Sequence, residues 1–159
     1  VAYRAMTARG FPGFGHWLDQ GATVTWEKWN GQDSRNHPMF GGALMWYYNT
    51  LAGINPLEDA PGFRRFVVKP YPAAGLSGVS YSLETPYGEA ASEVSCGDGA
   101  TALTVTVPVG SEAEIWVPLP SSSARVTLAD GTPVVGQQSP DGRWFVTRAP
   151  QGRWSFSAR

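Results

Sequence analysis

The sequence is short of cysteine, of charge and of long apolar runs, and each shortage excludes a class of protein. One cysteine and two histidines among 159 residues exclude an intrachain disulfide and leave too few soft ligands for a structural zinc site. Charged residues make up only 16% of the chain, 12 basic against 13 acidic, so nothing favours nucleic acid or an anionic membrane as a partner. The longest apolar run, Ala43 to Tyr48, is far shorter than the ~20 residues that cross a bilayer.

The abundance of hydrophobic and aromatic residues indicates a folded protein with a packed core. Hydrophobic residues reach 42% and aromatic residues 13% of the chain, whereas disordered chains contain few of either. The chain starts at Val1, and the residues up to Thr7 have the pattern of a helix interior with no N-cap before it. We therefore expect the chain to be the C-terminal part of a longer protein.

The composition changes near residue 60, which predicts two different architectures. Residues 1–59 contain both histidines, all three methionines and four of the seven tryptophans. Helices are predicted over residues 2–8 and 13–20, and from Pro38 to Gly53. In the last of these helices apolar residues recur with the 3.6-residue spacing of a buried face. They are Phe40, Ala43, Leu44, Tyr47, Tyr48 and Leu51. Three such helices cannot enclose a core by themselves.

Residues 60–159 have the pattern of a β-domain. Val79, Tyr81 and Leu83 alternate with polar residues, as do the apolar residues of 103–107, and this period of two is typical of half-buried strands. Further short strands are expected over 66–68, 115–117, 125–128, 144–147 and 154–157. Asp-Gly dipeptides at 98–99, 130–131 and 141–142 favour tight turns. The set predicts an antiparallel β-sandwich of the jelly-roll kind.

One segment of the first part concentrates groups that suit a sugar. Glu27 lies between Trp26 and Trp29; indole rings stack on the apolar face of a sugar, while a carboxylate contacts hydroxyls or activates water. The residues alone also allow a plainer interpretation, with Glu27 in a surface ion pair and both tryptophans in a core. His37, just before Pro38, fits either a helix cap or a donor aimed into a cleft.

Other catalytic signatures are missing from the sequence. It has no phosphate-binding or dinucleotide-binding glycine motif, no H-E-x-x-H and no G-x-S-x-G. In the β-rich part Trp116, Trp144 and Trp154 lie in strand patterns, where they would form core or, if exposed and coplanar, a platform for sugars.

Four motifs in this order resemble the C-terminal part of bacterial α-L-rhamnosidases of glycoside hydrolase family 78. They are GATVTWEKW (21–29), NHPMFG (36–41), LAGI (51–54) and PGFRRF (61–66). The resemblance implies that residues 1–59 are the last helices of an (α/α)6 barrel and that residues 60–159 are the C-terminal β-sandwich. It further implies hydrolysis of terminal α-L-rhamnose with inversion, a rhamnoside substrate, the rest of the barrel as a partner, and no metal or other cofactor.

The same resemblance assigns roles to residues. Glu27 would be the general base, His37 would contact the bound sugar, and Trp26 or Trp29 would line the site. The family's general acid belongs to a D-x-x-x-R-x-E motif, but no Asp here is followed four residues later by Arg. The loop from Glu27 to His37 is also shorter than in the family. We therefore expect the chain alone to be inactive.

Two alternatives remain open at this point. In one, the β-sandwich is a carbohydrate-binding or purely structural module. In the other, the barrel belongs to a six-hairpin glycosidase that acts on a different sugar.

Overall fold

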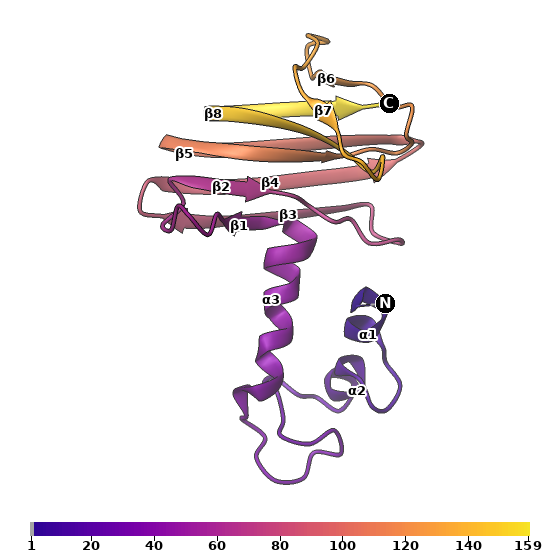
Figure 1. The fold of residues 1–159 in the computed structure, drawn as a ribbon. Helices are drawn as coiled ribbons and strands as arrows, with labels where there is room; N and C mark the ends of the chain where they lie inside the picture. Colours follow the sequence, from indigo (N-terminus) through magenta and orange to yellow (C-terminus); the bar gives the residue numbers. More distant parts are fainter. Residues whose placement is uncertain (1) are drawn as a thin grey trace. The chain divides into compact units, whose positions relative to one another are not determined.

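The computed structural model describes residues 2–159 and contains two compact units, Val1–Tyr47 and Tyr48–Arg159 (Figure 1). The units divide before the predicted boundary at residue 59, because β1 (Ile54–Pro56) is already paired in the sheet. Within the described residues no helix is long and apolar enough to cross a membrane.

Helices form over the three predicted ranges. They are α1 (Ala2–Thr7), α2 (Phe14–Asp19), and a continuous run made of η1 (Pro38–Ala43), α3 (Leu44–Trp46) and η2 (Tyr47–Ala52). The predicted buried face of this run is wrong in part, because Leu44 and Tyr48 are 51% and 40% exposed while Leu51 is buried. The run changes from 3-10 to α to π geometry, and each change rotates the side chains away from a 3.6-residue period.

The second unit is built on one hydrogen-bonded sheet with the strand order β1-β2-β5-β4-β3, while β8 pairs with β5, β6 and β7. The remaining strands are β2 (Arg65–Val68), β3 (Gly78–Thr85), β4 (Gly88–Gly97), β5 (Ala100–Pro118), β6 (Val126–Leu128), β7 (Gln137–Gln138) and β8 (Trp144–Ala158). The prediction of a β-rich domain is confirmed. Its antiparallel character holds for all pairs except β2 and β5, which run parallel.

Two long strands replace four of the predicted short ones. The register of the β5–β8 pair shifts between Val107 and Glu112, where both strands bend; Gly110 and Gly152 allow this with φ values of +78° and +133°. The first half of β5 pairs with β4 and the second half with β2, so the sheet curls into two layers, with β2 in front of β4 in Figure 1. The sequence pattern predicted the two halves of β5 and of β8 as separate strands and did not show that each pair is one continuous strand.

The core lies between the two layers and draws on both. Phe66 and Val68 of β2 share one cluster with Val94 of β4 and with Leu103 and Ile115 from the two halves of β5, all at most 1% exposed. Inner and outer side chains alternate along each strand, as the period of two requires.

Gly53 joins the helical run to β1 through a contact that only glycine permits. Its N–H donates to the carbonyl of Tyr48 (3.1 Å) and its carbonyl accepts from Lys69 N–H (2.9 Å). Its φ is +75°, and a Cβ there would lie 2.1 Å from the carbonyl carbon and oxygen of Lys69. Both the conformation and the close approach exclude a side chain.

We therefore expect Gly53→Ala to lower the free energy of unfolding of the second unit by at least about 3 kcal/mol, since it combines backbone strain with a backbone clash. Gly131→Ala is the matched control, because Gly131 has φ +89° but open space around its Cβ position; it should lose only about 1–2 kcal/mol. Urea denaturation followed by circular dichroism measures both, and equal losses would contradict the steric argument.

Candidate functional site

A cluster of aromatic rings forms the core of the first unit. Trp17 is 2% exposed, and its ring centroid lies 4.4 Å from that of Trp29, 5.4 Å from Phe40 and 5.9 Å from Trp26. Its Nε1–H donates to the carbonyl of Trp29 (3.1 Å), which satisfies its one polar atom. Phe14 packs edge-on against Trp17, Trp29 and Phe40. The sequence did not predict that Trp17 and Phe14 support the site, because the pattern of a single aromatic residue in a short helix does not distinguish this role from ordinary core packing.

This cluster supports a closed loop over residues 25–37. Glu27 N–H donates to Ser34 O (2.8 Å) and His37 N–H donates to Thr25 O (2.9 Å), so the two arms of the loop are tied at two points. Gly31 has φ +73°, and a Cβ there would lie 2.8 Å from a ring carbon of Trp26. The loop therefore lies directly on the buried indole of Trp26.

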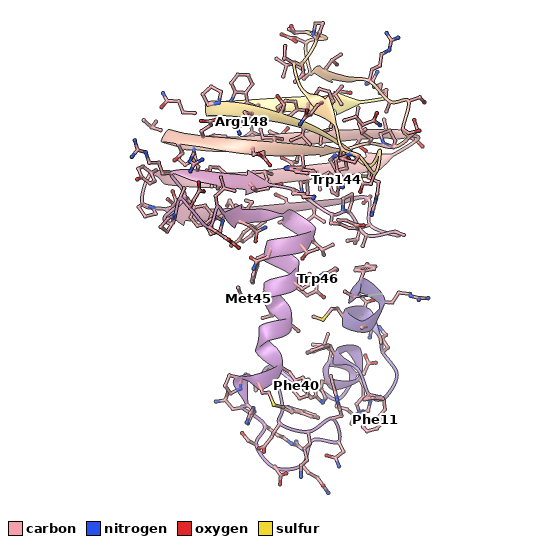
Figure 2. The ribbon with its side chains drawn as sticks, viewed as in Figure 1. Phe11, Phe40, Met45, Trp46, Trp144 and Arg148 are labelled. Atoms are coloured by element: carbon pink, nitrogen blue, oxygen red, sulfur yellow. The ribbon has the colours of Figure 1, made fainter. Side chains whose placement is uncertain are left out.

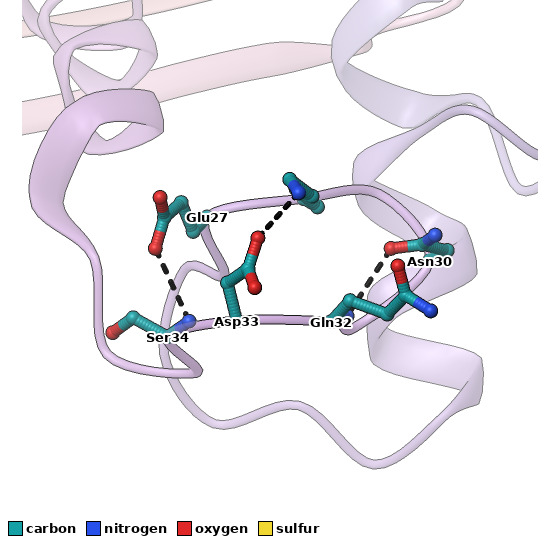
Figure 3. A network of polar contacts seen from close by, with 6 residues as sticks. Glu27, Asn30, Gln32, Asp33 and Ser34 are labelled. Carbon is teal, nitrogen blue, oxygen red and sulfur yellow. Dashed lines mark hydrogen bonds and ion pairs between the residues drawn. The ribbon is translucent and has the colours of Figure 1, made fainter.

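The carboxylate of Glu27 is held at one oxygen. Its Oε2 accepts a hydrogen bond from the backbone N–H of Ser34 (3.2 Å) (Figure 3). Among residues 2–159 Glu27 forms no ion pair, and no hydrogen bond to its Oε1 is found there. A half-buried carboxylate in this state is oriented but keeps one oxygen available to a water or a hydroxyl.

An ion pair closes the loop beside Glu27. The ammonium group of Lys28 pairs with the carboxylate of Asp33 across the loop (Figure 3). The hydrogen bond to Asp33 raises the pKa of Lys28, and the negative charges of Asp33 and, more weakly, Glu27 add to this effect. Lys28 therefore remains a cation throughout the neutral range, bound to Asp33 rather than to Glu27.

His37 acts as the cap of η1. Its Nδ1 accepts from the backbone N–H of Met39 (3.2 Å). In the neutral imidazole the proton then lies on Nε2, and no partner of Nε2 is found among residues 2–159. The two interpretations of His37 are thus compatible, because capping with one nitrogen presents the other as a donor.

The four predicted site residues lie on this loop or directly beneath it. Trp26 is 7% exposed, with the guanidinium of Arg35 4.8 Å from its ring centroid, whereas Trp29 is half-buried. No cluster of three or more metal-ligating side chains occurs in the part of the chain that the structure describes.

The tryptophans of the second unit do not form an exposed flat platform. Trp144, labelled in Figure 2, is 4% exposed. Its ring meets that of Trp116 at an interplanar angle of 76°. The ammonium of Lys69 lies 3.7 Å from the Trp116 ring centroid, and Trp154 bonds the carbonyl of Pro150 (2.9 Å). The sugar platform considered for these three residues is therefore not supported.

We expect Trp17→Ala to destabilise the first unit by about 3–5 kcal/mol, the usual cost of removing a buried aromatic side chain, and so to release the loop. Hydrogen exchange at the amides of Glu27 and His37 measures this, with faster exchange expected at both. Leu18→Ala is the control: Leu18 is the next residue but is 66% exposed, and its loss should change stability by no more than about 0.5 kcal/mol. Unchanged exchange in Trp17→Ala would show that the cluster does not support the loop.

Both units are similar to parts of known glycosidases. Residues 1–51 match the model of the bacterial alpha-L-rhamnosidase 6 hairpin glycosidase domain, and residues 53–141 match that of the bacterial alpha-L-rhamnosidase C-terminal domain. An alpha-L-rhamnosidase from Formosa agariphila is 32% identical over 135 residues, 78% of this chain and 14% of the relative. One from Streptomyces avermitilis is 30% identical over 129 residues, 74% of this chain and 12% of the relative.

Solved structures agree with these matches. The alpha-L-rhamnosidase from Dictyoglumus thermophilum superposes with a TM-score of 0.86 at 26% identity, covering 99% of this chain and 18% of that one. The Streptomyces avermitilis alpha-L-rhamnosidase complexed with L-rhamnose gives a TM-score of 0.84 at 27% identity, covering 99% of this chain and 16% of that one. The chain spans less than a fifth of each of these proteins. With a family model that covers more than half of its residues, the chain belongs to the bacterial α-L-rhamnosidase family.

Proposed function

We propose that this chain is the C-terminal part of an inverting glycoside hydrolase that removes terminal α-L-rhamnose from glycosides or polysaccharides. The support is the family membership, together with relatives named alpha-L-rhamnosidase and a similar structure complexed with L-rhamnose. A six-hairpin glycosidase acting on another sugar is a weaker proposal, because the named relatives agree on one substrate sugar.

The first part of the chain, ending by residue 59, would supply the last helices of an (α/α)6 barrel, followed by the jelly-roll-like sandwich. Apolar side chains support this proposal, since several lie exposed on the first unit: Leu18 66%, Val24 47%, Met39 60%, Leu44 51% and Met45 56%. Met45, for example, projects from α3 into solvent (Figure 2). We propose that the remainder of the barrel covers these side chains.

Glu27 is our proposed general base, and its hydrogen bond to the Ser34 amide carries the proposal. An inverting enzyme needs an ionised carboxylate that holds a water on the face of the sugar opposite the leaving group, ~6.5–9.5 Å from the acid. The Ser34 N–H holds one oxygen of Glu27 in place. The other oxygen would accept a proton from the water as that water attacks the anomeric carbon. The acid, which protonates the leaving oxygen, would come from the remainder of the barrel.

His37 and the indoles would bind the sugar. With Nδ1 engaged by Met39, the Nε2–H of His37 is a donor for a sugar hydroxyl. Trp29 keeps exposed surface that could stack on the sugar ring, whereas buried Trp26 beneath Gly31 would act mainly as support.

In the longer enzyme, Glu27→Gln should lower kcat by about 10²–10⁴, the usual contribution of general acid–base catalysis, with KM much less affected. Glu58→Gln, a change of the same kind at an exposed site, is the matched control and should retain full activity. Aryl α-L-rhamnoside hydrolysis measures both.

Azide provides a sharper test of the base, because this nucleophile needs no proton removed. With Glu27→Ala, azide should restore turnover and give a rhamnosyl azide of inverted configuration. A Glu27→Gln enzyme within threefold of wild type, or a lack of azide rescue, would remove Glu27 from this role.

The 159-residue chain alone should show no hydrolysis of an aryl α-L-rhamnoside above the uncatalysed rate, since the sequence has no D-x-x-x-R-x-E acid motif. Co-expression with the remainder of the barrel should restore activity. Turnover by the isolated chain that Glu27→Gln abolishes would overturn the assignment of the acid to the missing part.

A further inference from the structure

A hollow of about 820 Å³ lies within the second unit, at the end of the sheet where β5 bends. Three segments that are distant in the sequence form it. They are residues 59–61, 64 and 65, which lead into β2, Tyr87 in the β3–β4 turn, and residues 110–112 of β5, with Pro150 of β8 alongside. It contains none of the residues discussed above as the catalytic site.

The hollow is lined by two cationic and two anionic side chains, so it has no net charge, and two of the four have no interaction partner among the described residues. Arg65 pairs with Asp59 (2.6 Å). Among residues 2–159 the side chains of Arg64 and Glu112 form neither an ion pair nor a hydrogen bond, although Glu112 N–H donates to the carbonyl of Arg64 (3.0 Å). The hollow therefore offers the planar guanidinium of Arg64, just before β2, as a donor and the carboxylate of Glu112 on β5 as an acceptor, with no net charge.

The bend of β5 adds an aromatic ring to the hollow. Tyr87 is 41% exposed and lies beside Gly110, whose Cβ position is 3.8 Å from the tyrosine ring. Gly110 N–H donates to Gln151 Oε1 (2.9 Å), which holds the bend. Ser111 is 6% exposed, and its Oγ has no partner among the described residues. This hydroxyl is too deeply buried to contact a ligand in the hollow, so the ring of Tyr87 is what the bend contributes to binding.

We propose that this hollow binds one neutral sugar unit of a glycan. An aromatic ring can cover the apolar C–H face of a sugar, while a guanidinium donates to vicinal hydroxyls and a carboxylate accepts from them. An anionic ligand would meet Asp59 and Glu112 as well as the arginines, so the balanced charge favours a neutral one. The site goes beyond the proposed catalytic function and uses none of its residues.

Saturation-transfer NMR on the 159-residue chain tests the proposal, with methyl α-L-rhamnoside and methyl β-D-glucoside as neutral probes and glucuronate as the charged one. At least one neutral probe should bind with a Kd of about 1 mM, and Arg64→Ala and Tyr87→Ala should each weaken that binding by roughly tenfold. Val135→Ala, at a 92% exposed residue outside the hollow, should leave it unchanged.

Glu27→Gln separates this site from the catalytic one, because it should not alter binding at the hollow. Binding that Glu27→Gln removes and Tyr87→Ala does not would overturn the hollow and leave the catalytic proposal intact. Absence of saturable binding by both neutral probes, or tighter binding of glucuronate, would overturn the neutral-sugar assignment.

Discussion

The pairing of β5 with β8 through a shared bend is the constraint on which the second unit depends. Because both strands continue past Gly110 and Gly152, the same two strands contribute to both layers of the curled sheet. The two halves of β5 therefore bury Leu103 and Ile115 in one core. The bend also leaves a hollow, since backbone that turns from one layer to the other cannot fill the space beside it.

The first unit is stabilised mainly by the packing of aromatic side chains. With only short helices, it relies on indole and phenyl rings to exclude water, and Trp17 lies at the centre of this cluster. The loop that carries Glu27 rests on these rings and is tied by backbone hydrogen bonds. The carboxylate of Glu27 on this loop has one oxygen bonded to a backbone amide before any ligand arrives, which would favour its proposed role.

The two proposed sugar-contacting regions divide the chemistry between the units. Around Glu27 a backbone amide anchors one carboxylate oxygen and leaves the other available, which suits the proposed role of accepting a proton from a water. Around Tyr87 the charges cancel and the surface is open, which suits binding without reaction.

The sequence by itself determined that short helices precede a β-rich part, and it predicted Glu27 as the residue with a chemical role. Period-two alternation predicted the strands, and the neighbourhood of Glu27 was evident from its flanking indoles. Local patterns carry this information because side-chain direction follows from local backbone geometry. The parallel pairing of β2 with β5, the bend at Gly110 and the amide of Ser34 that orients Glu27 were decided only by the tertiary structure. Each depends on contacts between residues whose spacing along the chain gives no sign of their meeting.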